Sequence, residues 1–206
     1  MNKRLVWNFE INSDNPLLLP DRDNIDQSEL CWESRFFWPD DQIITLQGLN
    51  DHFLNLSAYK IKHRDDTYYL LPNADYNLKI RREQLVYKPL LMKKGQAIAF
   101  GKKIKLEEHP PGQPLPGCED KEARTLIAQI KKQGIKIAVE KEALIYTFAT
   151  TPISKLELAW LHVADKAYYS VNIESRSLQW VEAMTKQLLD HVLASDYVTF
   201  LKQMAK

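Results

Sequence analysis

The stretch D-T-Y-Y-L-L-P-N-A-D-Y-N-L-K-I-R-R-E-Q-L-V-Y-K, residues 66–88, decides the fold class of this chain. Within it Lys79 and Arg81 fall on one face of an extended segment, and Leu78 and Ile80 fall on the other. Strands are therefore predicted at residues 67–71, 76–82 and 84–91, with turns at residues 65–66 and 72–75. Turns this short indicate antiparallel neighbours.

The same alternation recurs on both sides of this stretch. Glu33 and Arg35 share one face, opposed by Trp32 and Phe36, and Glu157 is opposed by apolar neighbours. Further strands are predicted at residues 5–11, 30–38, 54–61, 97–106, 135–139, 143–148, 156–163 and 168–173. Helical spacing predicts helices over residues 120–133 and from residue 178 onward. The fold class predicted is α+β, an antiparallel β-barrel or tunnel with covering helices, including C-terminal helices.

Length and composition suit one soluble domain. The 206 residues are 45% hydrophobic, the net charge is +1, and the two cysteines are far apart in the chain. We expect no general attraction to nucleic acid or membrane, and a cytoplasmic location with both thiols reduced. The expected division is an N-terminal arm or strand over residues 1–29, a tunnel core over 30–175 and helices over 176–206.

The charged faces admit two interpretations. For any single strand, a face turned to solvent is the more common one. Here, however, long cations gather on residues 79–88, carboxylates come late in the chain, and helices can cover the apolar outer face. A curled sheet that is apolar outside and cationic inside would need an anion to offset the desolvation of its charges.

Several motifs resemble those of CYTH proteins, the triphosphate tunnel metalloenzymes. D-T-Y-Y (66–69), L-K-I-R-R (78–82) and L-V-Y-K (85–88) are similar to the family's D-T-Y, (K/R)-x-R and late-Lys signature. W-E-S-R-F (32–36) looks like the second half of the opening E-x-E-x-K-F strand. L-E-L (156–158) and V-N-I-E (171–174) stand where the family places its closing acidic strands.

The resemblance implies a site for a triphosphate with Mg²⁺ or Mn²⁺. Guanidinium and ammonium groups hold phosphate oxygens, and carboxylates hold a hard divalent cation. By this resemblance the phosphate-binding residues are Arg35, Lys79, Arg81 and Lys88. The metal ligands that it implies are Glu33, Glu157 and Glu174.

The acidic positions depart from the family pattern, because each expected pair of acids is reduced to one. The opening motif reads C-W-E (31–33), Glu157 has Lys155 and Ala159 as same-face neighbours, and Glu174 has Asn172. Such a tunnel should hold a divalent metal poorly while still binding an anion. No catalytic residue is assigned, since His63, a lone histidine in a strand, is more often structural.

Three functions therefore remain in competition. The favoured one is binding of a phosphate-rich anion, meaning a triphosphate, a nucleotide or a polyphosphate, with weak metal-dependent phosphohydrolase activity left open. The first alternative is an active Mg²⁺- or Mn²⁺-dependent triphosphatase. The second is a non-catalytic interaction or structural protein that retains the fold. The expected partner is a phosphorylated small molecule or polyphosphate.

Overall fold

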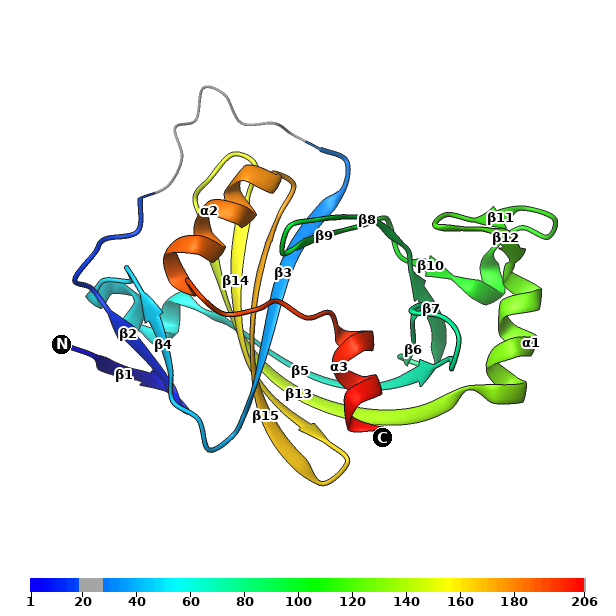
Figure 1. Cartoon of the computed structure of the whole chain (residues 1–206), viewed down its shortest axis with the longest axis horizontal. Coiled ribbons are helices and arrows are strands. Elements are labelled where there is room, and N and C mark those ends of the chain that lie inside the picture. Colours follow the sequence, from blue (N-terminus) through cyan, green and yellow to red (C-terminus); the bar gives the residue numbers. More distant parts are fainter. Residues whose placement is uncertain (19–27, 206) are drawn as a thin grey trace.

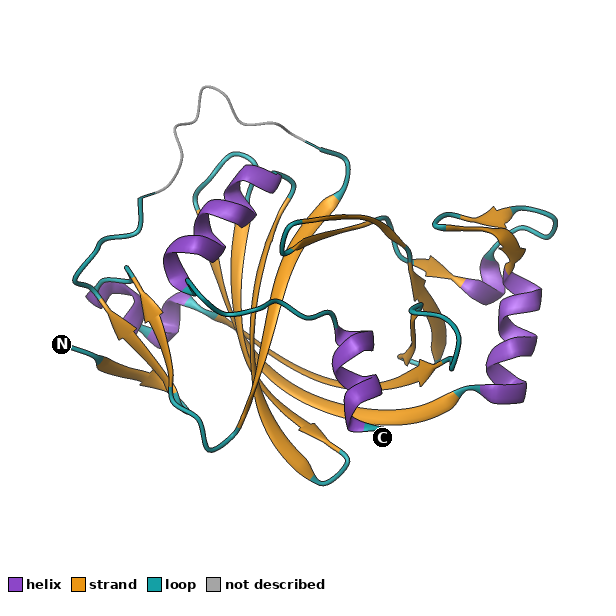
Figure 2. Cartoon of the chain, viewed as in Figure 1, coloured by secondary structure: helices purple, strands orange, loops and turns teal. Residues whose placement is uncertain are grey.

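A ten-stranded antiparallel sheet, curled into a ring of strands, forms the body of the protein (Figures 1 and 2). The structure is a computed structural model that describes residues 1–18 and 28–205, so residues 19–27 of the expected N-terminal arm lie outside the described residues. The strands in sheet order are β10 (Ile104–Lys105), β7 (Gln84–Lys88), β6 (Asn77–Arg81), β5 (Lys60–Leu70), β13 (Ile135–Phe148), β14 (Ser154–Val163), β15 (Lys166–Ser175), β3 (Cys31–Pro39), β9 (Ala97–Phe100) and β8 (Leu90–Lys94).

The chain itself links the two ends of this sheet. Strand β7, near one end, and β8, at the other, are separated in sequence by Pro89 alone. Proline has no N–H to donate to a ladder, so the predicted strand over residues 84–91 breaks there and changes partner. Gly101 then donates its backbone N–H to the Pro89 carbonyl at 3.0 Å. The predicted strand over residues 97–106 is likewise two strands, β9 and β10, which pair on opposite sides of this seam.

Other strand predictions need correction in the first third of the chain. Residues 54–61 were expected to form a strand, but 3-10 turns η2 (Asp51–Leu54) and η3 (Leu56–Ala58) occupy half of that range, and β5 begins at Lys60. Asp65 and Asp66 were expected in a turn, and both lie inside β5. The tertiary partner β13 pairs with β5 along its whole length, which overrides the local turn preference of Asp.

A small sheet beside the ring contains the N-terminal strands (left side of Figure 1). The expected single strand over residues 5–11 is a hairpin of β1 (Lys3–Val6) and β2 (Phe9–Asn12), and β4 (Ile44–Gln47) pairs with β2 in parallel. Phe9, Ile11 and Leu46 are fully buried in the core that also includes the outer face of β3, β14 and β15.

The mid-chain helix covers the outside of β6 and β7. Helix α1 (Ala123–Gln133) packs Leu126 and Ile130 against Leu78 and Tyr87, together with η4 (Leu106–Glu108), β11 (Pro114–Leu115) and β12 (Cys118–Glu122). Gly134 ends the helix with φ −73°, a conformation that any residue can adopt. It needs space instead, because a Cβ there would lie 2.5 Å from the Ile130 carbonyl oxygen.

The two C-terminal helices lie on opposite faces of the sheet. Helix α2 (Leu178–Leu188) packs Val181 and Met184 on the outer, convex face, whose side chains include Leu158 and Ile173. Helix α3 (Tyr197–Met204) lies against the concave face instead (Figure 1). There Phe200 stacks on Phe37 with ring centroids 4.0 Å apart.

The predicted fold class is confirmed. The protein is α+β, with a curled antiparallel sheet, and its strands are apolar on the convex face and charged on part of the concave face. The one deviation concerns coverage, since α3 packs inside the curl rather than outside it. Among the described residues, no helix is long and apolar enough to cross a membrane.

Truncation of the convex core should be costly. Leu158→Ala removes a fully buried side chain beneath α2, so we expect the free energy of unfolding to fall by about 2–5 kcal/mol. Leu193→Ala is the matched control, because Leu193 is 84% exposed and its loss should change stability by no more than about 0.5 kcal/mol. Urea unfolding followed by tryptophan fluorescence measures both, and equal effects would contradict the assignment of this core.

Candidate functional site

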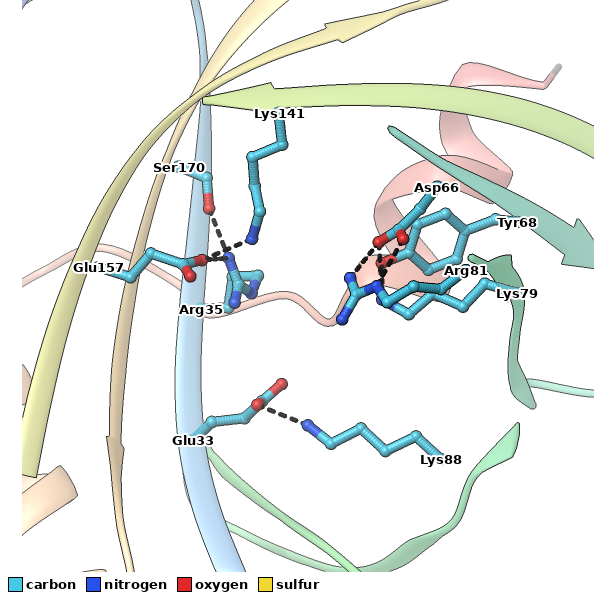
Figure 3. Close-up of polar contacts among 10 residues, drawn as sticks. All are labelled: Glu33, Arg35, Asp66, Tyr68, Lys79, Arg81, Lys88, Lys141, Glu157 and Ser170. Carbon is cyan, nitrogen blue, oxygen red and sulfur yellow. Dashed lines mark hydrogen bonds and ion pairs between the residues drawn. The ribbon is translucent and has the colours of Figure 1, made fainter. Parts of the chain in front are cut away.

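A network of charged side chains lies on the concave face of the sheet (Figure 3). Its charged residues come from six strands, β3, β5, β6, β7, β13 and β14. The two outermost of these, β7 and β3, face each other only because the sheet curls. It contains five cations and three carboxylates, namely Arg35, Lys79, Arg81, Lys88, Lys141, Glu33, Asp66 and Glu157.

Glu157 holds two of the cations. Its Oε1 accepts from Arg35 Nη1 at 3.1 Å and from Lys141 Nζ at 2.9 Å, and the same Arg35 nitrogen donates to Ser170 Oγ at 3.0 Å. Burial by itself would raise the pKa of Glu157, but the Lys141 and Arg35 charges hold that pKa well below its usual range. This carboxylate is therefore ionised, and its Oε1 holds both cations.

Asp66 holds two further cations. Arg81 binds both carboxylate oxygens, with Nε 2.7 Å from Oδ1, and Lys79 Nζ lies 3.0 Å from Oδ2 and 3.0 Å from the Tyr68 hydroxyl. Burial lowers the pKa of Lys79 to about 8, and the neighbouring Arg81 charge acts in the same direction against the attraction of Asp66. Lys79 therefore loses its proton more readily than an exposed lysine.

Besides the groups around Glu157 and Asp66, a third group of the network, the pair Lys88 and Glu33, spans the width of the ring. Lys88 on β7 donates to Glu33 Oε2 on β3 at 2.8 Å, and its ammonium lies 3.8 Å from the centroid of the Phe100 ring. The charge of Lys88 lowers the pKa of the buried Glu33 carboxyl against the effect of burial, and Arg35 adds to this.

An aromatic pair closes one side of the network. Tyr197, the first residue of α3, stacks on Tyr68 with ring centroids 5.2 Å apart, and the Arg35 guanidinium lies 4.8 Å from the centroid of the Tyr197 ring. Two buried polar atoms here, Arg35 Nε and Asn77 Oδ1, have no hydrogen-bond partner among the described residues. Unpaired buried polar atoms are costly, so these two call for a partner that the described residues do not supply.

The structure brings six of the seven predicted site residues together. Arg35, Lys79, Arg81, Lys88, Glu33 and Glu157 all belong to the network. Glu174 does not: it lies opposite Glu33 in the β15–β3 register and pairs with Lys155 at 2.8 Å, in a half-exposed position. The cations were expected to repel one another without a ligand, but Asp66, Glu33 and Glu157 lie between them.

Sequence reasoning missed Asp66, Lys141 and Tyr197. Asp66 has the same strand parity as Tyr68, which is a usable signal, but the turn assignment hid it. Lys141 falls in the gap left between two predicted strands, which are in fact the single strand β13. Tyr197 reaches the network through a helix whose docking face no local pattern specifies.

The carboxylates do not fit the divalent cation that the family resemblance implies. Each of the three in the network already bonds one or two side-chain cations, and Glu174 bonds Lys155. Within the described residues, no group of three or more His, Cys, Asp or Glu side chains is placed to hold a metal ion.

Two pockets have residues of the network in their lining. One, of about 740 Å³, includes Asp66, Arg81 and Arg64 in its lining. The other, of about 220 Å³, includes Glu33 and Arg35 together with Ser195 and Thr199 at the start of α3. Both pockets therefore adjoin the network, and the first is the larger and the more cationic.

Comparison with known proteins gives little beyond this geometry. The chain matches no known protein-family profile and no curated protein. A solved structure from Bacillus halodurans, described as a "putative adenylate cyclase", is 10% identical to it over 84% of this chain and 87% of that chain, with a TM-score of 0.38.

Removing one carboxylate should show how much the stability of the protein depends on compensation of the buried positive charges. Glu157→Gln leaves the Arg35 and Lys141 charges without an anionic partner, so we expect the free energy of unfolding to fall by about 3 kcal/mol. Millimolar tripolyphosphate should restore part of this loss in a thermal unfolding experiment, because an external anion can take the place of the carboxylate.

Glu174→Gln provides the matched control for that variant. The Lys155–Glu174 pair is half-exposed, with side-chain exposures of 43% and 32%, so the change should cost no more than about 1 kcal/mol. Equal destabilisation of the two variants would contradict the central role of Glu157.

Proposed function

We propose that this protein binds a phosphate-rich anion, such as a triphosphate, a nucleotide or a polyphosphate, on the concave face of its curled sheet. The observation that carries the proposal is the charge imbalance of the network, in which five cations surround three carboxylates. The resemblance of residues 66–88 to CYTH signature motifs supports the same chemistry.

Burial makes this excess of positive charge energetically costly. Arg35, Lys79 and Lys141 are each only 8% exposed, so water screens their charges poorly. A buried positive charge without a compensating anion costs several kcal/mol, and an anion with several oxygens would supply both the missing charge and acceptors for the unpaired Arg35 Nε. Fork-shaped guanidinium groups suit phosphate oxygens in particular.

Stability alone does not account for the network. Replacing buried ion pairs by apolar side chains of similar volume is often neutral or stabilising, and the convex face shows that this chain builds an apolar core elsewhere. Strongly shifted pKa values, such as those of Lys79 and Lys141, both lowered to about 8 mainly by burial, are also typical of functional sites.

Binding without efficient hydrolysis is the form of the function that the geometry favours. Hydrolysis assisted by Mg²⁺ or Mn²⁺ would need several carboxylate oxygens directed at one ion. Glu33, Asp66 and Glu157 each bond side-chain cations instead, and among the described residues no group of three or more acidic, His or Cys side chains is placed to hold a metal. A purely structural role would leave the excess of cations and the two adjoining pockets unexplained.

Ligand stabilisation and phosphate release test the proposal together. Tripolyphosphate, ATP and thiamine triphosphate should be compared with and without Mg²⁺ or Mn²⁺. A binder at 100 times its Kd should add about 2.7 kcal/mol of stability, which is a rise in Tm of roughly 5–11 °C for a chain of this size. We expect this shift with one of the three ligands, and no phosphate release above the rate of the ligand alone.

Arg81→Gln should weaken this binding by about tenfold to a hundredfold, since it removes charged hydrogen bonds while Asp66 keeps Lys79 as its partner. Arg124→Gln on α1 carries the same charge change at an exposed position outside the network and should have no effect. A Tm unchanged by all three ligands in the wild-type protein would overturn the proposal. Metal-dependent phosphate release that Arg81→Gln abolishes would establish a hydrolase instead.

The affinity should fall as the pH rises above about 8. Lys79 and Lys141 have pKa values lowered to about 8, and only their protonated forms attract an anion, so affinity is present below that pH and is lost above it. The loss should approach roughly tenfold per pH unit for each lysine that must be protonated.

Titration calorimetry at several pH values between about 7 and 9.5 measures this profile. The ligand itself gains negative charge as the pH rises, which acts in the opposite direction, so a decline belongs to the protein. Lys79→Arg, which stays charged throughout, should flatten the profile, and an unchanged profile in that variant would exclude Lys79 as a titrating group.

A further inference from the structure

A row of cations continues outward from the network along β5. Lys60, Lys62 and Arg64 alternate on the same face of the strand as Asp66, and together they extend over roughly 13 Å. They line the pocket of about 740 Å³, and Arg81 and Arg82 from the β6 end complete its cationic lining. We refer to Lys60, Lys62 and Arg64 as the β5 row.

The β5 row lacks internal partners. Within the described part of the chain, none of its three side chains forms an ion pair, in contrast to the cations of the network. Burial and the neighbouring Arg64 and Lys60 charges lower the pKa of Lys62, so these cations repel one another in the protein as it stands.

Arg64 connects the row to the network. Its charge acts on both Lys79 and Lys141, lowering the pKa of each, and it also lowers the pKa of Lys103. Lys103 lies on the loop that crosses the seam between β9 and β10, and Lys79 and Arg81 lower its pKa as well. Arg64 also lies directly opposite Lys141 in the β5–β13 register, so the row adjoins the network.

A protective role explains the row only in part. From Lys60 to Asp66, β5 has β13 as its partner on one side, whereas β6 pairs with β5 only at Thr67 and Tyr68. Lysines on such a free strand edge discourage edge-to-edge aggregation. That role does not require a pocket, or cations that converge on a buried network from two separate segments of the chain.

We propose that the β5 row is an outer subsite, and that the ligand is a linear phosphate chain whose inner end lies in the network while its outer part lies along Lys60, Lys62 and Arg64. This inference rests on the proposed function and adds the class of ligand. A chain with repeated negative charges matches the row of cations, whereas a compact anion held by the network would leave the row uncompensated.

The lining of the pocket favours a chain without bases. Single-stranded nucleic acids are held by aromatic side chains on which bases stack as well as by cations. Among the described residues that line this pocket there is no Phe, Tyr or Trp, and His63 is the only ring. Inorganic polyphosphate is the linear anion that requires cations and no stacking surface.

Affinity as a function of chain length tests the subsite. Tripolyphosphate and a long-chain inorganic polyphosphate should be titrated into the wild-type protein and into the double variant Lys60→Gln/Lys62→Gln. Arg64 is kept because its charge acts on the lysines of the network. We expect the long chain to bind the wild type more tightly, and the double variant to lose about threefold to tenfold in affinity for the long chain only.

The control is Lys131→Gln/Lys132→Gln, which removes the same charge from the exposed face of α1 and should leave both affinities unchanged. A wild-type protein that binds the two probes equally, or a double variant that weakens both equally, would overturn the outer subsite while leaving the proposed function intact. Absence of binding to either probe would overturn both. Tighter binding of a single-stranded oligonucleotide of equal charge, lost in the double variant, would replace polyphosphate by nucleic acid as the ligand.

Discussion

The curl of the large sheet is the constraint on which the rest of the structure depends. Strands β7 and β3 are six positions apart in the sheet, so in a flat sheet they would be separated by roughly 29 Å. Lys88 and Glu33 nevertheless meet at 2.8 Å across the concave face. Pro89 joins β7 directly to the far edge strand β8, so the covalent chain holds the two ends of the sheet close together.

The curl also determines how the two faces are used. Outside, α1 and α2 bury apolar side chains from alternate strand positions, which is where most of the hydrophobic stabilisation arises. Inside, α3 covers only the apolar part of the concave face and leaves the charged part beside its first residue, Tyr197. The inner surface is therefore divided between packing and charge.

Internal carboxylates allow this charged surface to exist in the free protein. Asp66 and Glu157 each hold two cations, and Glu33 holds one, which leaves an excess of positive charge rather than a balanced core. An incoming anion would share these cations with the carboxylates rather than meet them bare. Among the described residues these paired carboxylates form no group of three or more acidic, His or Cys side chains placed to hold a divalent metal.

Local patterns in the sequence predicted most of the strands and, within them, the face on which each side chain lies. The alternation at Lys79 and Arg81 predicted one charged and one apolar face because side chains alternate strictly along a strand, and both faces are found. Alternation says nothing about partners several strands away, so Asp66 was placed in a turn and Lys141 fell between two predicted strands.

The sequence by itself determined the α+β class, the charged and apolar strand faces and six of the residues that meet in the network. Only the tertiary structure decided that the sheet closes at Pro89, that α3 packs inside rather than outside, and that Asp66, Lys141 and Tyr197 complete the site. The physical reason is range: side-chain direction follows from local backbone geometry, whereas the register of distant strands and the docking of a helix depend on packing across the whole fold.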